Sequence, residues 1–144
     1  MYKIVIFTLA ISCFTFVHCG NNNGKGEGNT GAQTPPNENV KIAFREYEHN
    51  FGKVTEGEKV ASVFTFENDG TEDLVITSAI ASCGCTIPKY NKKPIPPGGA
   101  GSLEVVFNTS GRNGIQTKTI TVKSNASVPV VLLKITAEVV NASN

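Results

Sequence analysis

Apolar and polar residues alternate with a period of two through most of the chain after about Val40, and this pattern limits the fold more than any other feature. Successive side chains of a β-strand point to opposite faces of a sheet. In 103–107 the odd-numbered residues are apolar, and in 131–139 the odd-numbered residues are again apolar while the facing positions 134, 136 and 138 are polar. No apolar stripe with helical spacing persists. The chain is therefore predicted to form β-strands with one buried face.

Turn signals divide this pattern into several short strands. Residues that favour turns gather at 68–70, 96–99, 110–114 and 124–127. Short strands with a turn about every dozen residues predict an all-β fold, an antiparallel β-sandwich. The segment 40–144 has the usual size of an immunoglobulin-like domain, about 100 residues. The Cys…Trp…Cys pattern of antibody domains is absent, because the chain has no Trp.

The same alternation predicts which side chains fill the space between the sheets. Leu74 and Ile76 are expected to share the inner face of one strand, and Ile80 is expected to continue it. The expected core consists of Phe44, Phe51, Val54, Phe64, Phe66, Leu74, Ile76, Leu103, Val105, Phe107, Ile120, Val122, Leu133 and Ile135. At 144 residues the chain has room for one such domain and its appendages.

The N-terminal residues are predicted to be an export signal, with residues 1–18 as the signal peptide. Lys3 precedes an uncharged apolar run over 4–17, which is too short to span a bilayer comfortably, since that takes about 20 apolar residues. The run ends at Cys19, in a context that resembles the cleavage site of bacterial lipoproteins, where the cysteine receives the lipid. We therefore expect an exported lipoprotein of the bacterial envelope, anchored at the periplasmic face or in the outer membrane.

Cys13 is a second possible lipidation site. The lipoprotein pattern prefers a small residue before the cysteine, and Ser12 fits that preference better than His18. Lipidation at Cys13 would, however, leave a short apolar core before it and place 14–17 in the mature protein. An uncleaved anchor helix and simple secretory cleavage also stay open. Residues 19–39 are then rich in Gly, Asn and Pro and are predicted to be a disordered tether.

Two of the four cysteines, Cys83 and Cys85, flank Gly84. On an extended chain their Cα atoms would lie roughly 6.5 Å apart, near the upper end of the disulfide range. Gly84 lets the chain bend and bring the sulfurs closer. A disulfide, a free dithiol and a two-thiolate metal clamp are all open, as is a tight turn that holds two small half-buried residues.

A metal site would require further ligands. Structural zinc takes four ligands, whereas Cu(I) accepts two thiolates with little else. His49 is the one histidine that follows the predicted signal peptide, so His49, Cys83 and Cys85 form the candidate set for copper or zinc.

Catalysis and nucleic-acid binding have little support in the sequence. Thiol oxidoreductases usually place Cys-x-x-Cys at a helix N-terminus, but here Pro88 follows the pair and no helix is predicted. No Gly-x-Ser-x-Gly elbow is present. A formal net charge of +1 argues against nucleic acid, and the short basic run 89–93 is expected to be a solvated loop. Three Asn-x-Ser/Thr matches, at 108–110, 125–127 and 141–143, have no expected role in a bacterial lipoprotein.

Several short motifs together resemble one bacterial family. The chain is similar to the domain of unknown function 1573, found in exported proteins of Gram-negative bacteria, over roughly 44–139. The motifs that carry the resemblance are His49–Val54 with Glu56-Gly57, Phe64–Gly70, Leu74–Ile76, Ser82–Thr86, Ile95–Gly98, and Ile120–Val122 with Ser124-Asn125. The family is similar to immunoglobulin-like domains of the ASPM–SPD-2–hydin type, which serve as binding or scaffold modules. The resemblance implies a sandwich fold and a non-enzymatic role, and it supplies no activity.

From these observations we expect a membrane-anchored binding or scaffold module whose partner is an envelope protein or a glycan. The expected contact surface is a sheet edge or the loops around Cys83–Pro97. Metal binding through Cys83 and Cys85 is the first rival hypothesis. A thiol-redox enzyme is the second.

Overall fold

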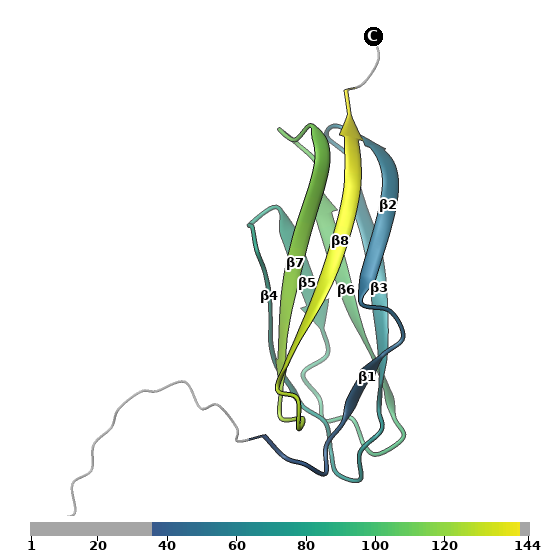
Figure 1. Ribbon diagram of the computed structural model, residues 1–144, viewed down its shortest axis with the longest axis vertical. Helices are drawn as coiled ribbons and strands as arrows, with labels where there is room; N and C mark the ends of the chain where they lie inside the picture. The colour runs from purple at the N-terminus through teal and green to yellow at the C-terminus, as the bar shows by residue number, and fades with distance from the viewer. Residues whose placement is uncertain (1–35, 142–144) are drawn as a thin grey trace, which may run out of the picture. The chain divides into compact units, whose positions relative to one another are not determined.

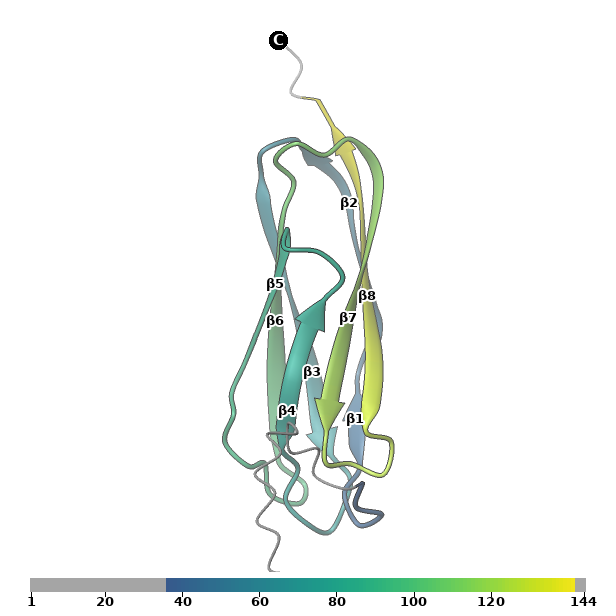
Figure 2. The ribbon, with the colours of Figure 1, turned by 90° about the vertical axis from the view of Figure 1, so that its left-hand side faces the viewer.

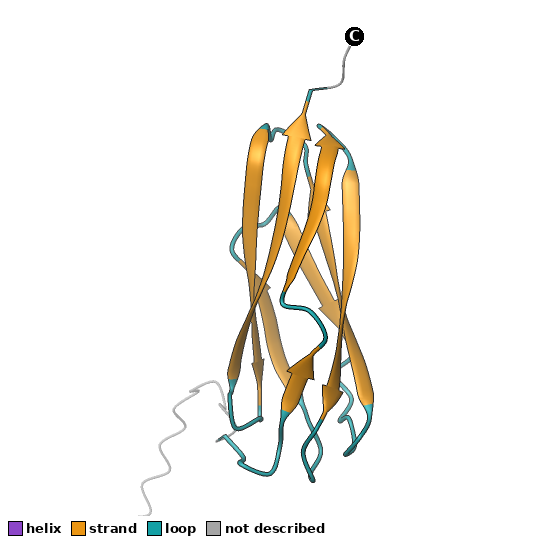
Figure 3. Ribbon diagram, turned by 45° about the vertical axis from the view of Figure 1, so that its right-hand side comes forward, coloured by secondary structure: helices purple, strands orange, loops and turns teal. Residues whose placement is uncertain are grey.

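The computed structural model describes residues 36–141, and the regular elements in this range are all strands (Figures 1 and 3). They are β1 (Ile42–Phe44), β2 (Glu48–Thr55), β3 (Lys59–Asn68), β4 (Ile76–Ala81), β5 (Thr86–Tyr90), β6 (Ala100–Asn108), β7 (Gly114–Ser124) and β8 (Val130–Val140). No helix in this part of the chain is long and apolar enough to cross a membrane. The predicted signal peptide 1–18, Cys13, Cys19 and most of the tether lie outside the described residues.

The strands form two four-stranded sheets packed face to face. One sheet has the order β1-β3-β6-β5 and the other β2-β8-β7-β4. This is the strand order of an immunoglobulin-like sandwich in which the first strand is divided between the sheets. The predicted fold class is therefore confirmed. The chain already joins the domain before Val40, because the Asn37 N–H donates to the Asn125 carbonyl at 2.9 Å.

One pair of strands departs from the antiparallel pattern. β2 runs parallel to β8, from Glu48 beside Lys134 to Thr55 beside Val140. The cause is the short segment between β1 and β2, which carries the chain from one sheet to the other (Figure 3). The two halves of the first strand keep one direction, so β1 meets β3 antiparallel while β2 meets the last strand parallel.

The core follows the predicted alternation with one exception. All of the predicted core residues are buried except Phe51, which is only half-buried against the core. Three steps along β2, from Asn50 to Lys53, match two steps along β8, and Gly52 in this bulge has φ = 69°. Such a bulge re-aims side chains on the bulged strand. Further buried apolar residues are Val40, Ile95, Ala126, Ala137 and Val139.

The prediction that Ile80 continues the inner face of β4 is wrong, because its side chain is 61% exposed. Ile76 pairs with Ser124 and Ser78 with Lys123, so β4 carries one extra residue relative to β7. A shift of one residue moves every later side chain to the opposite face. Ala79 and Ala81 therefore pack against the core in its place.

Candidate functional site

Cys83 and Cys85 form a disulfide, with Cα atoms 5.3 Å apart. Of the states left open by the sequence, this is the one in the structure. The pair lies in the turn after β4, where the chain crosses to β5 in the other sheet (Figure 2). Both cysteines are half-buried, and the Thr86 Oγ1 lies 3.6 Å from the Cys83 Sγ.

Backbone hydrogen bonds tie this turn to both sheets. The Ser82 N–H donates to the Thr119 carbonyl on β7 at 2.9 Å. On the other side, the Asn108 N–H on β6 donates to the Cys85 carbonyl at 2.9 Å. The disulfide therefore closes the turn that links the two sheets, and its position is that of a bond that stabilises this turn.

His49 lies away from the cysteines. It stands on β2, and the sheet order places β8 and β7 between β2 and β4. Three strand spacings amount to about 14 Å. The His49 Nδ1 is instead 3.8 Å from the Glu46 Oε1, and its ring packs edge-on against Phe51 at 4.7 Å between centroids.

The geometry does not assemble the three candidate metal ligands. Within residues 36–141 no group of three His, Cys, Asp or Glu side chains is placed to hold a metal ion. The disulfide also removes the thiolates that a soft metal would require.

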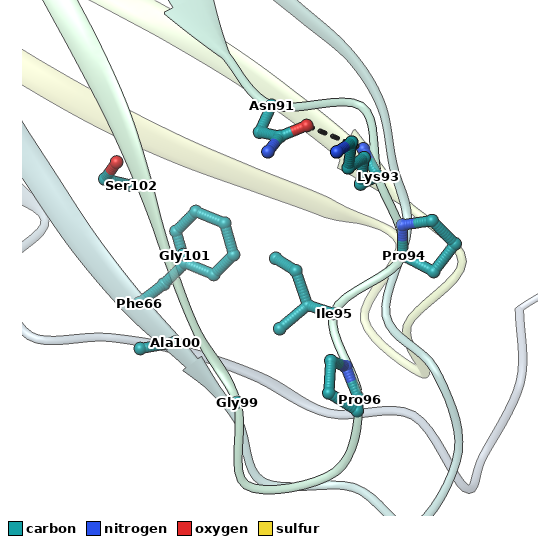
Figure 4. A pocket seen from close by; sticks show the side chains of 10 residues that line it. All are labelled: Phe66, Asn91, Lys93, Pro94, Ile95, Pro96, Gly99, Ala100, Gly101 and Ser102. Carbon is teal, nitrogen blue, oxygen red and sulfur yellow. Dashed lines mark hydrogen bonds between the residues drawn. The ribbon is translucent and has the colours of Figure 1, made fainter.

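A groove of about 530 Å³ lies at the opposite end of β5 from the disulfide (Figure 4). Pairing between β5 and β6 ends at Tyr90 and Leu103. After Tyr90 the chain turns away from its neighbour β6, forms the loop 91–99, and enters β6 itself at Ala100. The groove lies between this loop and the first residues of β6, within the region around Cys83–Pro97 where the sequence predicts a contact surface. Its lining residues are Phe66, Asn91, Lys93, Pro94, Ile95, Pro96, Gly99, Ala100, Gly101 and Ser102.

Gly101 makes the apolar part of the groove possible. A Cβ at this position would lie 2.6 Å from the Phe66 Cε2 and 2.7 Å from the Ile95 Cδ1. Both side chains therefore approach the β6 backbone more closely than any other residue would allow (Figure 4). Sequence reasoning did not identify this residue, although a glycine inside an alternating strand is a signal of close approach.

Ile95 is held in place by three hydrogen bonds. It exchanges backbone hydrogen bonds with Leu74 at 2.8 and 2.9 Å, and its carbonyl also accepts from the Asn68 Nδ2 at 2.9 Å. The Asn68 side chain is fully buried and donates to the Glu72 carbonyl as well, at 2.8 Å. The sequence pattern indicates only a turn at Asn68 and does not reveal its role as an anchor of the 91–99 loop.

The predicted turn at 96–99 closes this loop. The Gly99 N–H donates to the Pro96 carbonyl at 2.9 Å, and Gly98 has φ = 72°, a conformation that glycine adopts at little cost. The Asn91 Oδ1 accepts from the Lys93 N–H at 2.9 Å at the other end of the loop (Figure 4). These bonds fix both ends of the loop that borders the groove.

Charged side chains lie near the groove, and Lys93 is one of its lining residues. Glu104 on β6 is paired with Lys89, at 3.6 Å between Oε1 and Nζ. The prediction that the whole basic run 89–93 is a solvated loop is wrong for Lys89 and Tyr90, because they pair with β6 as the last residues of β5. Lys92 and Lys93 lie in the loop and are exposed, and neither has an ion-pair partner within residues 36–141.

The neighbouring acid on β3 is also neutralised. Glu67 lies beside Ala100, and its Oε1 accepts from the Arg45 Nη2 at 2.6 Å. The hydrogen bond from Glu67, followed by its Coulomb attraction, raises the pKa of Arg45 above its ordinary value. Glu67 is therefore paired with a cation, as Glu104 is.

The family model described as "Protein of unknown function (DUF1573)" matches residues 42–139. The chain belongs to this family. The match covers nearly all of the folded part, including the disulfide turn and the groove. A comparison with curated proteins gives no significant match.

Solved structures with the same architecture come from proteins of diverse kinds. A protein of unknown function from Porphyromonas gingivalis W83 is 18% identical, with a TM-score of 0.62 over 70% of this chain and 47% of that chain. The ASH/PapD-like domain 7 of human CEP192 is 14% identical, with a TM-score of 0.55 over 94% of this chain and 99% of that chain.

The secreted serine protease VesC from Vibrio cholerae is 13% identical, with a TM-score of 0.55 over 78% of this chain and 24% of that chain. The chain thus spans about half of the P. gingivalis protein and a quarter of VesC. At these identities the likeness shows the fold alone.

Proposed function

We propose that this chain is an exported, lipid-anchored binding or scaffold module of the bacterial envelope. In this proposal Cys19 carries the lipid, residues 20–39 are the tether, and the sandwich binds another envelope protein. Binding takes place at the groove between the loop 91–99 and β6. The observation that carries the proposal is a preformed apolar groove beside a strand segment that lacks a neighbour on one side.

The dimensions and chemistry of the groove support binding. Its volume of about 530 Å³ falls within the range typical of ligand sites, about 300–1,000 Å³. The lining is mostly apolar, with a few polar groups at the rim, as such sites usually are. Lys93 is the one ionisable side chain that lines it, so a pair of groups for acid–base catalysis is not assembled there.

The location of the groove fits a tethered domain. The chain enters the sandwich at the end where β3 finishes, because the Asn39 carbonyl accepts from the Thr71 N–H at 2.7 Å. The turn 96–99 lies at the same end, since the Gly98 N–H donates to the Asn68 carbonyl at 2.9 Å. A partner bound in the groove would thus contact the end of the domain that the tether reaches.

Affinity purification of the full chain from envelopes of the producing cell tests the proposal. The site variant is Lys92→Glu with Lys93→Glu, which reverses the charge at the rim. The matched control is Lys53→Glu with Lys59→Glu, which makes the same change on exposed lysines of β2 and β3. We expect the site variant to lose a protein that the unmodified chain and the control both retain. If all three retain the same proteins, the groove is not the binding site.

A further inference from the structure

We infer that β4 is the edge at which two copies of this chain pair, with the Ile80 side chains of the copies in contact at the two-fold axis. The two β4 strands run antiparallel and join the β2-β8-β7-β4 sheets of both copies into one continuous sheet. This surface is separate from the groove, and the inference goes beyond the proposed function without resting on it. It depends on three features of β4: its open backbone, its lack of charge, and the exposure of Ile80.

The second half of β4 presents backbone groups on the side away from β7. Just after β4, the Ser82 N–H donates to the Thr119 carbonyl on β7. The direction of these groups alternates along an antiparallel strand. Ile80 therefore also bonds β7, whereas Ala79 and Ala81 direct their N–H and carbonyl groups outward. β4 is the last strand of its sheet, and no strand lies in front of it in Figure 2. A further strand can therefore pair at this edge.

The other three edge strands carry features that discourage pairing with another chain. β1 has only three residues, and β2 contains a bulge at Gly52 with Lys53 beside it. β5 contains Pro88 and Lys89. Short length, bulges, proline and lysine are the means by which edge strands avoid association. The bulge of β4 comes before the segment 78–82, which is regular and contains neither a charged residue nor proline.

An uncharged edge suits an identical partner, because two copies then meet without like charges opposite each other. In the inferred register Ile80 stands opposite Ile80 of the second copy, and Ala79 stands opposite Ala81. The outward groups of these two alanines bond across the axis. Ile80 is then in a pair without hydrogen bonds, with Cα atoms about 4.5 Å apart. The contact removes from water an apolar side chain that is 61% exposed in the single chain.

Lys123 is the charged residue beside the paired segment, because it pairs with Ser78 in the sheet. The two copies of Lys123 are separated by three strand spacings and by four residues along the strands. Their Cα atoms therefore lie roughly 20 Å apart. Repulsion between exposed charges at this separation is largely screened, since the Debye length is about 10 Å at 0.1 M salt.

The remaining charged groups near this edge do not oppose the pairing. Lys89 on β5, in the other sheet, is already paired with Glu104. The Lys118 Nζ lies above the Phe107 ring, 6.0 Å from its centroid, and therefore points between the sheets. The acidic residues 72–73 precede β4 and lie beyond the paired segment.

Disulfide trapping of the purified full chain in detergent tests the inference. Two short strands bury less area than a standard interface of about 1,600 Å², so the dimer is expected to be weak and has to be trapped. Ile80→Cys is made in the Cys83→Ser, Cys85→Ser background, so that the new thiol cannot exchange with the native disulfide. The same background without a new cysteine measures linkage through the N-terminal cysteines.

The expected result is a disulfide-linked dimer that a reductant dissolves. A Cα separation of about 4.5 Å lies within the disulfide range, so oxidation with copper–phenanthroline should link Ile80→Cys at least about fivefold more than the background. The matched control is Leu132→Cys, which lies on the same face of the same sheet and is 58% exposed. Five strand spacings, about 24 Å, separate its two copies, so it should stay at the background level.

Charge at positions 78 and 82 tests the register, because Ser78 stands opposite Ser82 of the second copy. Added to Ile80→Cys, Ser78→Lys with Ser82→Lys places like charges opposite each other and should reduce trapping. Ser78→Lys with Ser82→Glu places opposite charges there and should restore it. Both variants lose the Ser82 Oγ, which accepts from the Thr119 N–H, so this loss is the same in the two.

A mixture of Ser78→Cys and Ser82→Cys chains keeps the test valid if Ile80→Cys fails to fold. The mixture should form linked dimers, and neither chain alone should do so, because four residues along the strands separate the two copies of each position. Equal trapping of Ile80→Cys and Leu132→Cys would overturn the inference, as would trapping of neither above the background. Stronger linkage of Ser78→Cys to Ile80→Cys than of Ile80→Cys to itself would contradict the contact at the axis.

Discussion

Gly101 is the residue on which the shape of the groove most depends. The side chains of Phe66 and Ile95 occupy the space where a Cβ would lie. We expect Gly101→Ala to lower the free energy of unfolding by about 1–3 kcal/mol, because inserting a methyl group into a packed site forces its neighbours to move. Urea denaturation of the purified chain measures this.

Gly84→Ala is the matched control for that substitution. No atom lies within 4 Å of a Cβ built at Gly84. Its unfolding free energy should stay within about 0.5 kcal/mol of the unmodified chain. Equal losses at both positions would show that the close approach at Gly101 has no energetic consequence.

Asn68 should be the polar side chain whose removal costs most at this end of the sandwich. It donates two hydrogen bonds, to the carbonyls of Glu72 and Ile95, and it accepts one from the Gly70 N–H at 3.0 Å, in a fully buried position. Asn68→Ala is expected to lower the free energy of unfolding by about 2–4 kcal/mol, since it leaves buried partners unsatisfied.

Hydrogen exchange of the loop 91–99 tests the anchoring role directly. In Asn68→Ala the amides of this loop should exchange faster than those of β7 and β8. Asn91→Ala, which removes one exposed local bond, should change the unfolding free energy by less than about 1 kcal/mol. Unchanged exchange in the loop would mean that Asn68 does not hold it.

At the residue scale, the role of Gly101 could be predicted from the sequence, whereas that of Asn68 could not. A glycine within the alternating run of β6 is a local signal that can be read without a structure. Asn68 carries no such signal, because Asn-Asp-Gly is also what a plain turn requires. Its burial depends on the loop that returns from β5, which lies 27 residues away at Ile95.

The disulfide belongs to the scale of elements, since it closes the turn that carries the chain from β4 to β5. The closed loop spans only Cys83–Cys85, so the loss of unfolded-chain entropy is small, about 1.5 kcal/mol at 25 °C. We expect reduction to lower the unfolding free energy by about this amount and to leave the domain folded. Urea denaturation with and without a phosphine reductant measures the difference.

The double variant Cys83→Ser with Cys85→Ser provides the control for reduction. Its stability should not respond to the reductant and should match that of the reduced chain. Complete unfolding on reduction would contradict this expectation, because the backbone bonds from Ser82 to Thr119 and from Asn108 to Cys85 also hold this turn.

The sequence predicted which segments form strands better than it predicted the bulges and the pairing directions of those strands. The alternation over 103–107 and 131–139 identified β6 and β8, because each is long and has one buried face. It misassigned Ile80 because a bulge adds one residue without a sequence signal as strong as glycine or proline. The parallel pairing of β2 with β8 was likewise missed, since it depends on where the first strand changes sheets.

At the scale of the whole molecule, the period of two and the turn spacing were sufficient to predict the two-sheet sandwich. The groove itself was not predicted; the sequence suggested only a contact surface at a sheet edge or in the loops around Cys83–Pro97. The groove forms because β5 ends at Tyr90, opposite Leu103, so residues 100–102 of β6 have no partner from β5. No local sequence pattern marks the point where β5 ends. The predicted metal set failed to assemble for a similar reason, because the sheet order separates His49 from the cysteines.

Photo-crosslinking in the producing cell tests the binding groove most directly. A photoreactive residue replaces Ala100 at the groove in one strain and Ile115 in another, where the side chain is 82% exposed at the start of β7, beyond the far end of β6. We predict a discrete crosslinked protein from position 100 that is absent from position 115. The same adduct from both positions, or no adduct from position 100, would contradict binding at the groove.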